Sequence, residues 1–509
     1  MGTISTAVSR TRTLLTALVL LPVAALGMSA ATALGAPIAS TTDPAPTLPA
    51  DPGGPAPGYL IKNAKKAPQN PFLGSNPWSN IHNDTWMTDA YRRNAPLGRD
   101  SVAFSGSMPN AICASLAFDS RGRINTICPT RGAAPTVRMI DPETLEVLAT
   151  YTMPYSPPPE GTAPYQNFAG GGYFYADKRD RLWVPTQNNH IQVIGQTDDG
   201  SGFELRRDFD MTSAVNPATE RMNSALPDFE GRIWFVVKQT GKVGTLDIDT
   251  RQIRFLKLDE PIENSFTVAE GGVYVVTDKA MYRFRANQKG APRVAWRAGY
   301  RNTGKAKPGQ AGPGSGTTPT ILHGGYVGIA DNANPMNVVV YRTKNRLAKG
   351  ERRKVCEIPV FKKGASGTEN TLVGVRRSLI VENNYGYTNP LPPESIPVTE
   401  PGFARINVNK NGNGCTKAWT NHTERGASVV PKISVKTGLI YTYTMPDDPS
   451  GARGYYWTAI DFRTGETAFS RFAGAGILFN NNYAAINIAP SGTAYVGVIG
   501  GIAALRDGS

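Results

Sequence analysis

Four acidic side chains stand at the ends of short apolar segments, and their type suits acid and base chemistry. These candidate catalytic residues are Glu263, Asp331, Glu369 and Glu382. A carboxylic acid and a carboxylate about 5 to 9 Å apart can hydrolyse a glycosidic bond, one group acting as acid and the other as base or nucleophile. Spacing along the chain does not give that distance, so the four residues remain candidates.

Amide, basic and aromatic side chains also stand at the ends of short apolar segments. The candidate ligand-binding residues are Asn167, Gln187, Asn189, His190, Asn223, Lys238, Asn264, Asn332, Asn370, Asn383 and Tyr385. Converging amides and aromatic rings would bind a polyhydroxylated ligand, whereas a lyase would use a Tyr, His or Lys base such as Tyr385, His190 or Lys238. Asn also caps turns and satisfies strand ends, so a purely structural interpretation stays open for each residue.

The strands that must position these candidate residues repeat along the chain. An apolar strand, a tight turn and a second strand of alternating apolar residues follow one another eight times. The second strands are expected at 123–127, 181–184, 232–236, 273–276, 326–329, 379–381, 439–442 and 494–497, a mean spacing of roughly 53 residues. Two more strands complete each unit, and four antiparallel strands in about 50 residues make one propeller blade. We therefore predict an all-β fold, a single eight-bladed β-propeller over residues 110–509, with seven blades as the alternative.

The last unit of this repeat is one strand short. Only Ile502–Leu505 follows its second strand, while Ser101–Ser105 precedes the first unit and lacks a partner of its own. We predict that this N-terminal strand completes the last blade, closes the ring and covers an exposed edge. The loops that enter each first strand, and those that join the second strand to the third, then open on one end of the ring. We call this end the mouth and expect ligands there.

The segment 459–469 reads AIDFRTGETAF and resembles the A-x-D-x-x-T-G-x-x-x-W docking repeat of quinoprotein-type (PQQ-like) eight-bladed propellers, with Phe in place of Trp. Asp141 with Thr144, and Asp247 with Thr250, keep the Asp and the Thr. The resemblance implies the propeller fold. Redox members of that superfamily carry two adjacent cysteines over the quinone, and no two cysteines are adjacent here. We therefore expect no PQQ and predict no cofactor, while a Ca²⁺ ion held by oxygen ligands stays open.

The four cysteines fit two disulfides. A hairpin centred between Ser120 and Arg121 would pair residues whose numbers add to 241, which places Cys113 opposite Cys128 at a distance that a disulfide can bridge. Cys356 and Cys415 pair by elimination, each near the start of an outermost strand in neighbouring blades. No C-x-x-C spacing or attendant His accompanies them, so we predict no metal site.

The N-terminus has the composition of a secretory signal over residues 1–36. Arg10 and Arg12 precede an apolar run at 14–27, which is shorter than a bilayer span and is followed by small residues. Residues 37–59 are rich in Pro, Ala and Gly and are predicted to form a linker. Residues 60–109 are predicted to form an N-terminal wrapping segment that includes the closing strand. For its part around His82 three interpretations stay open, since it could wrap the ring, approach a ligand or pack against a blade.

Charge is concentrated in one region. The chain has a formal net charge of +14, and residues 279–363 hold 18 Lys and Arg against three Asp and Glu. This basic arc predicts salt-sensitive adhesion to an anionic polymer, and export disfavours nucleic acid. We predict a secreted, extracellular or cell-surface monomer with no transmembrane segment in the mature chain, which recognises a polyanionic or polyhydroxylated envelope or matrix polysaccharide. The alternatives are a polysaccharide lyase or glycoside hydrolase with carboxylates at the mouth, and a quinoprotein-type oxidoreductase; the sequence does not decide whether the chain is an enzyme.

Overall fold

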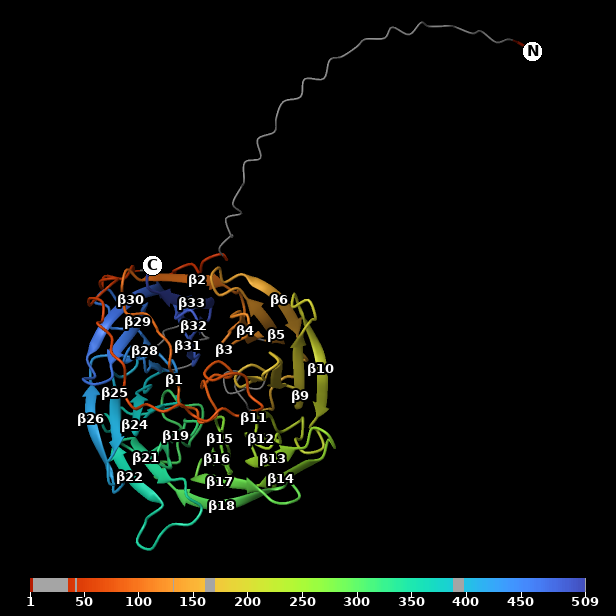
Figure 1. The fold of residues 1–509 in the computed structure, drawn as a ribbon. Coiled ribbons are helices and arrows are strands. Elements are labelled where there is room, and N and C mark those ends of the chain that lie inside the picture. Colours follow the sequence, from red (N-terminus) through yellow and green to blue (C-terminus); the bar gives the residue numbers. More distant parts are fainter. Residues whose placement is uncertain (3–34, 42–43, 131, 161–169, 388–397, 509) are drawn as a thin grey trace. The chain divides into compact units, whose positions relative to one another are not determined.

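The computed structural model describes residues 1–2, 35–41, 44–130, 132–160, 170–387 and 398–508. The chain divides into residues 1–33 and residues 34–509, and every strand of the described residues belongs to the second unit. These strands form eight sheets, which succeed one another clockwise around a ring in the view of Figure 1. The predicted eight-bladed propeller is thereby confirmed, and the seven-bladed alternative is wrong.

Each blade is an antiparallel sheet of four strands, named here from the innermost outward. Blade 1 holds β3(Ser115–Phe118), β4(Ile124–Thr130), β5(Ala133–Ile140) and β6(Val147–Thr152). Blade 2 holds β7(Tyr175–Ala176), β8(Leu182–Pro185), β9(His190–Gln196) and β10(Phe203–Asp210). Blade 3 holds β11(Met222–Pro227), β12(Ile233–Val237), β13(Lys242–Leu246) and β14(Ile253–Lys257). Blade 4 holds β15(Thr267–Ala269), β16(Gly272–Val276), β17(Ala280–Ala286) and β18(Pro292–Gly299).

The second half of the ring repeats this order. Blade 5 holds β19(Thr320–Leu322), β20(Tyr326–Ala330), β21(Asn337–Arg342) and β22(Lys354–Pro359). Blade 6 holds β23(Val373–Val375), β24(Ser378–Glu382), β25(Phe403–Val408) and β26(Cys415–Asn421). Blade 7 holds β27(Lys432–Ser434), β28(Leu439–Thr444), β29(Gly454–Asp461) and β30(Thr467–Ala475). Blade 8 holds β31(Ile486–Ile488), β32(Ala494–Val498), β33(Gly501–Arg506) and β2(Val102–Ser107), while η2(Ile477–Phe479) is the one 3₁₀ turn among the described residues.

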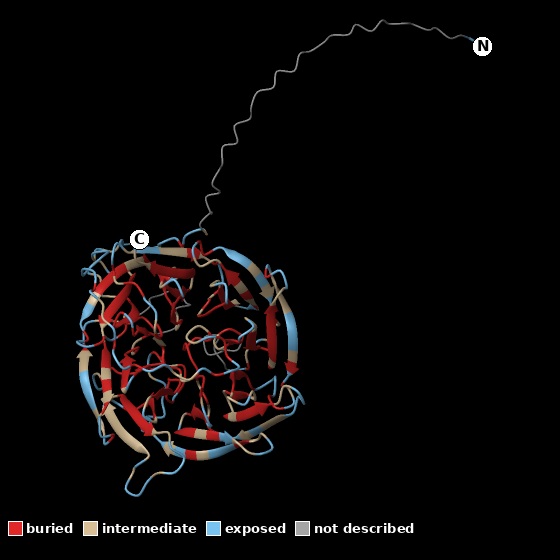
Figure 2. Ribbon diagram, viewed as in Figure 1, coloured by how far each residue is buried: buried red, intermediate tan, exposed pale blue. Residues whose placement is uncertain are grey.

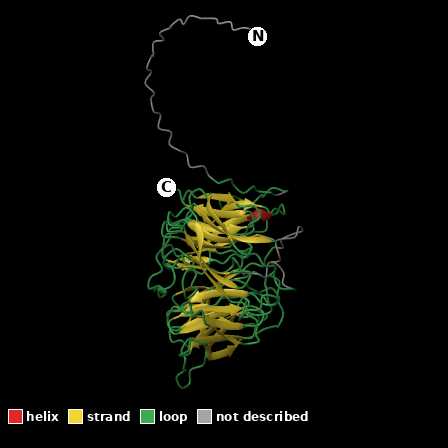
Figure 3. Ribbon diagram, turned by 90° about the vertical axis from the view of Figure 1, so that its right-hand side faces the viewer, coloured by secondary structure: helices red, strands yellow, loops and turns green. Residues whose placement is uncertain are grey.

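Burial follows the position of a strand in its blade. The second strands, such as β12 and β16, are buried along their whole length because neighbouring blades pack on both of their faces. The outermost strand of blade 1, β6, alternates between exposed and half-buried residues. Figure 2 shows this change from the buried inner strands to the partly exposed rim, and Figure 3 shows the strands stacked around the ring from the side. The core is therefore the set of interfaces between blades.

The docking motif of the sequence forms a turn between the third and fourth strands of blade 7. The Asp461 carboxylate accepts hydrogen bonds from the backbone N–H groups of Arg463 (2.6 Å) and Thr464 (3.2 Å). Gly465 has a φ of 79° and lies against Trp419 of the neighbouring blade, at a distance where a side chain would clash. The motif thus both fixes a tight turn and brings blades 6 and 7 together.

The N-terminal strand closes the ring as predicted. β2 pairs antiparallel with β33, Val102 opposite Arg506 and Ser107 opposite Gly501, and it forms the outermost strand of blade 8. The first and last parts of the propeller are therefore hydrogen-bonded into one sheet, and the outer edge of β33 is covered.

The segment Asn70–Tyr91, which we call the channel segment, lies inside the ring against the innermost strands. It hydrogen-bonds to the innermost strand of every blade, through Phe118, Ala176, Pro227, Val268, Ile321, Gly374, Ile433 and Ile488. Within it, β1(Ala90–Tyr91) pairs in parallel with β27. The innermost strands would otherwise present unpaired backbone groups to the channel, so this segment satisfies them.

The segment with linker composition is also hydrogen-bonded to the ring. Pro52 and Ala50 accept backbone hydrogen bonds from Ser470 and Phe472 of β30, and Tyr59 donates one to Thr437. These bonds are made by backbone groups. A proline-rich segment keeps its carbonyl oxygen atoms as acceptors. For that reason composition alone gave no sign of the contact.

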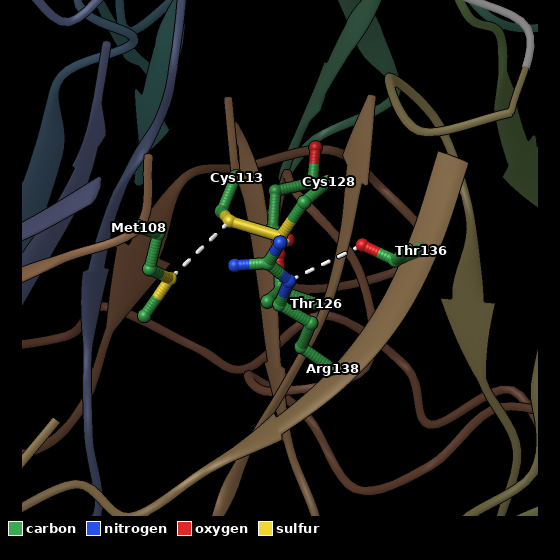
Figure 4. Close-up of a disulfide and its surroundings, with 7 residues drawn as sticks. Met108, Cys113, Thr126, Cys128, Thr136 and Arg138 are labelled. Atoms are coloured by element: carbon green, nitrogen blue, oxygen red, sulfur yellow. Dashed lines mark hydrogen bonds between the residues drawn. A yellow bond between two sulfur atoms is a disulfide. The ribbon is translucent and has the colours of Figure 1, made fainter. Parts of the chain in front are cut away.

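Both predicted disulfides are confirmed, Cys113–Cys128 and Cys356–Cys415. The first lies buried in blade 1 beside Met108, with Arg138 and Thr136 nearby (Figure 4). The predicted register of its hairpin is wrong by one residue, since Phe118 pairs with Ile124 and the turn centres on Arg121. Beyond the cysteines, Ala111 pairs with Thr130, which is the predicted register. This change of register along the hairpin sets Cys113 opposite Cys128.

Candidate functional site

A cavity of 380 Å³ opens at the mouth of the ring. Among the predicted site residues, Gln187, Asn264, Glu369 and Asn370 line it. Apolar and aromatic residues from blades 1, 2, 7 and 8 complete its wall, including Ile112, Pro129, Tyr155, Tyr173, Val430 and Tyr483. A few polar groups in a largely apolar wall are typical of small-ligand sites.

Glu369 is the acid of this cavity. It lies just before β23, is 7% exposed, and its Oε1 accepts a hydrogen bond of 3.4 Å from Asn264 Nδ2. Its Oε2 is buried without a hydrogen-bond partner among the described residues. Burial, and next the neighbouring Glu263 carboxylate, raise the pKa of Glu369 to about 8. Glu369 is therefore a neutral carboxylic acid at pH 7, able to donate a hydrogen bond or a proton.

Glu263 lies beside Glu369 as part of an ion pair. Its carboxylate contacts the Lys238 ammonium group, and both side chains are mostly buried. Gly312 lies so close that a side chain there would clash with Glu263 Oε2, and the same holds for Gly316 and Glu369 Oε2. The glycine-rich loop at 312–316 thus packs tightly over both carboxyl groups, because its glycines leave room for them.

Two aromatic residues line the cavity near the acid, Tyr173 and the channel-segment residue His82. Tyr173 Oη donates a 2.8 Å hydrogen bond to Asn264 Oδ1. His82 Nε2 lies 3.2 Å from Thr371 Oγ1, and its Nδ1 lies 3.2 Å from Asp89 Oδ1. Burial lowers the pKa of His82, so the ring is neutral and its Nδ1–H points to the carboxylate. The floor of the cavity is therefore uncharged.

Most of the other predicted amides hold loops together. Asn189 Nδ2 donates to Glu220 O, and Asn223 Nδ2 donates to Glu263 O. Asn332 Nδ2 donates to Asn302, Lys305 and Pro313, and Asn383 accepts a hydrogen bond from Gly367 N and donates one to Ala365 O, both in the connection between β22 and β23. None of these four amides lines the mouth cavity. Their contacts fit the structural interpretation of Asn at strand ends.

Four further predicted residues also lie away from the cavity lining. Asp331 caps the end of β20 by accepting hydrogen bonds from Ala333 and Asn337, and burial raises its pKa to about 6. Glu382 is buried beside Asn384 with a pKa raised well above the usual range by burial. His190 is bonded to Asp208 (2.8 Å) on the outer strands of blade 2, and Tyr385 does not line the cavity. Asn167 lies outside the described residues.

Sequence reasoning missed the aromatic and channel-segment residues of the cavity. Tyr155, Tyr173 and Tyr483 lie in loops of three different blades, and His82 belongs to the channel segment. The apolar context of the tyrosines is also that of ordinary core residues, so it carried no signal. The odd mixture of aromatic and polar residues around His82 was the one usable hint.

The basic arc at 279–363 is partly neutralised. Arg297 pairs with Glu260 (2.9 Å), Arg301 pairs with Glu357 (2.6 Å), and Lys344 pairs with Glu351 (2.9 Å). Arg342 also pairs with Glu351, and Lys354 also pairs with Glu357. Adhesion of an anionic polymer to this arc remains a prediction.

Among the described residues, no group of three or more His, Cys, Asp or Glu side chains is placed to hold a metal ion. Within the same part of the chain, no helix has the length and hydrophobicity needed to cross a membrane.

Comparison with known proteins leaves the family and the activity open. The sequence matches no protein-family model. It is 26% identical over 480 residues to an uncharacterized protein of Archaeoglobus fulgidus, covering 87% of this chain and 89% of that protein. Similar solved structures include BamB from Moraxella catarrhalis, with 10% identity, TM-score 0.46 and coverage of 77% of this chain and 95% of that one. A streptogramin B lyase structure has 9% identity, TM-score 0.39 and coverage of 80% and 97%. At these values we assign no activity from the similarity.

The raised pKa of Glu369 predicts a pH-dependent contribution to stability. The unfolded chain releases this proton near its ordinary pKa of 4.5, whereas the folded chain keeps it up to about pH 8. The folded state thus binds more protons in this window, so the free energy of unfolding falls as pH rises from about 4.5 to about 8. Glu369→Gln removes this contribution.

Urea unfolding at a series of pH values measures the effect. We expect the wild type to lose stability relative to Glu369→Gln as pH rises through the window, and Glu466→Gln, at an exposed carboxyl group, to follow the wild type. Parallel curves for the wild type and Glu369→Gln would contradict the burial of a neutral acid.

Proposed function

We propose that the chain is an exported β-propeller that binds a polyhydroxylated ligand, such as a segment of an envelope or matrix polysaccharide, in the mouth cavity. The observation that carries this proposal is the composition of the 380 Å³ cavity, in which amides and a neutral acid stand among tyrosine rings. Amide and carboxyl groups hydrogen-bond hydroxyls, and tyrosine rings pack against the C–H faces of sugars.

Charge favours a neutral ligand over an anionic one at this end. Glu369 is protonated, His82 is neutral, and Glu263 is balanced by Lys238. The cavity thus offers no excess positive charge to an anion. A ligand of hydroxyl groups would meet donors and acceptors without losing the hydration of a charge.

Export is supported by two kinds of observation. Two disulfides are formed, and disulfides persist in oxidising compartments outside the cytosol. The first 36 residues have the composition of a secretory signal.

Glycan-array binding followed by titration calorimetry tests the proposal. Tyr155 is 47% exposed and lines the cavity, so Tyr155→Ala should leave the fold intact and weaken binding of the best glycan roughly three- to tenfold through lost ring contact. Tyr385→Ala, at a tyrosine outside the cavity lining, is the matched control and should bind as the wild type does. Absence of glycan binding, or equal binding by both variants, would overturn the proposal.

A second candidate function is glycoside hydrolysis in the same cavity, favoured by the raised pKa of Glu369 next to a carboxylate. A protonated carboxyl group can act as the general acid while a neighbouring carboxylate acts as the base. Glu369→Gln distinguishes the two functions, because glutamine keeps a hydrogen-bond donor but supplies no proton. Product release by the wild type that is lost in Glu369→Gln while binding is kept would show catalysis, and absence of product from both would leave a binding protein.

A further inference from the structure

The end of the ring opposite the mouth carries a groove with two lobes. The first lobe is a cavity of 360 Å³, lined by turns between first and second strands, by the channel segment and by the residues on either side of it. The second lobe, of 510 Å³, continues along blade 6 and shares Lys65, His323 and Arg376 with the first. We call the two lobes together the basic groove.

Cations dominate the lining of this groove. The first lobe is lined by Lys65, Lys66, Arg92, Arg93, Arg376 and Lys436. The second lobe adds Arg377, Arg405 and Lys410. Asp84 is the one carboxyl group among the described residues that line either lobe, and it is already engaged by the Thr88 hydroxyl and two backbone N–H groups. The groove therefore has a large excess of positive charge.

The pairing of these cations differs from that of the basic arc. Within the described part of the chain, none of the nine makes an ion pair, in contrast to the arc at 279–363, where Arg297, Arg301 and Lys344 do. Arg92 Nη2 is buried at the groove with no hydrogen-bond partner among the described residues. A buried donor without a partner is costly, so a ligand that accepts its hydrogen bond would stabilise the site.

We propose that the basic groove binds a polyvalent oxyanion, an extended ligand that carries several phosphate or sulfate groups. Guanidinium groups donate paired hydrogen bonds to tetrahedral oxyanions, and lysines add point charges. The two connected lobes suit a ligand longer than a single phosphate. This site is independent of the mouth cavity, which lies at the other end of the ring and lacks excess charge.

Titration calorimetry of the full chain with tripolyphosphate and with sucrose octasulfate, at low and at physiological salt, tests the proposal. We expect binding that weakens as salt rises. Arg376→Gln combined with Lys436→Gln, both at exposed positions, should weaken binding at least about tenfold, because each variant removes a charged contact. The charge-matched control combines Arg346→Gln with Lys349→Gln, two exposed residues of the basic arc.

The outcomes separate clearly. Binding of either probe that is lost in the groove variant and kept in the arc variant supports the site, and the preferred probe distinguishes phosphate from sulfate. Equal loss in both variants would show an effect of net charge alone and would overturn the proposal, as would absence of binding by both probes at low salt. Tyr155→Ala should bind both probes as the wild type does, so failure at the mouth leaves this result unaffected.

Discussion

Replacing Lys432 by methionine is expected to lower the free energy of unfolding by about 3 to 5 kcal/mol. Lys432 begins β27 and is fully buried, as is Asp89 of the channel segment, whose carboxylate it contacts. The same ammonium group donates to the Ile81 carbonyl oxygen. Methionine fills a similar volume but leaves the Asp89 carboxylate without its cation in the channel, and an uncompensated buried charge is among the largest single destabilising effects.

The expected consequence is local as well as global. The Lys432 ammonium group contacts the channel segment at two places, Ile81 and Asp89. Loss of both contacts should release this segment from the innermost strands. Urea unfolding measures the global effect, and limited proteolysis between residues 79 and 91 measures the local one. Lys436→Met, an exposed lysine four residues further on, is the matched control and should change stability by less than about 0.5 kcal/mol. Equal stability of the two variants would contradict this role of Lys432.

The blades were predictable from sequence because their determinants are local. Alternating apolar residues and tight turns recur in each unit, and all eight predicted second strands lie within β4, β8, β12, β16, β20, β24, β28 and β32 or extend one residue beyond them. The last unit has one strand fewer than the others, and this count predicted that the N-terminal strand completes the last blade. The error of one residue in the hairpin of Cys113 arose because a register shift next to the cysteines leaves no mark in the pattern of apolar residues.

The mouth was predictable in part. The position of a loop on the ring follows from topology, and this placed Gln187, Asn264, Glu369 and Asn370 at one cavity. Whether an asparagine faces a ligand or caps its own loop depends on side-chain direction, which spacing does not encode. Asn189 and Asn332 therefore resembled Asn264 in sequence but bond loop backbone instead.

The individual contacts of the channel segment were not predictable for a different reason. It touches the blades through single residues, such as Thr85 on Val268 and Thr88 on Gly374, and most of these bonds use backbone groups. Contacts of this kind follow no periodic pattern. The ion pair of Lys432 with Asp89 joins residues more than 300 positions apart, so no local signal connects them.

Loss of the Cys356–Cys415 disulfide is expected to lower the free energy of unfolding by about 4 kcal/mol on the chain-entropy account. The bond joins β22 of blade 5 to β26 of blade 6 and closes a loop of 59 residues, whereas Cys113–Cys128 closes 15 residues within blade 1. The longer loop restricts the unfolded chain more, so its removal costs more. Cys356→Ser with Cys415→Ser, compared with the wild type in urea, measures the loss.

Reduction under native conditions tests the same difference without mutation. Cys356 and Cys415 are half-buried at the rim, while Cys113 and Cys128 are 0% exposed inside blade 1. A thiol reductant must reach a sulfur atom to attack it, so dithiothreitol should open the rim disulfide first, and thiol labelling with mass spectrometry should find Cys356 and Cys415 before the other pair. The partly reduced protein should then unfold at lower urea than the oxidised one, by the same margin as the serine variant. Labelling of Cys113 and Cys128 first would mean that blade 1 opens more readily than the rim of blades 5 and 6, and would contradict the order of reduction expected from burial.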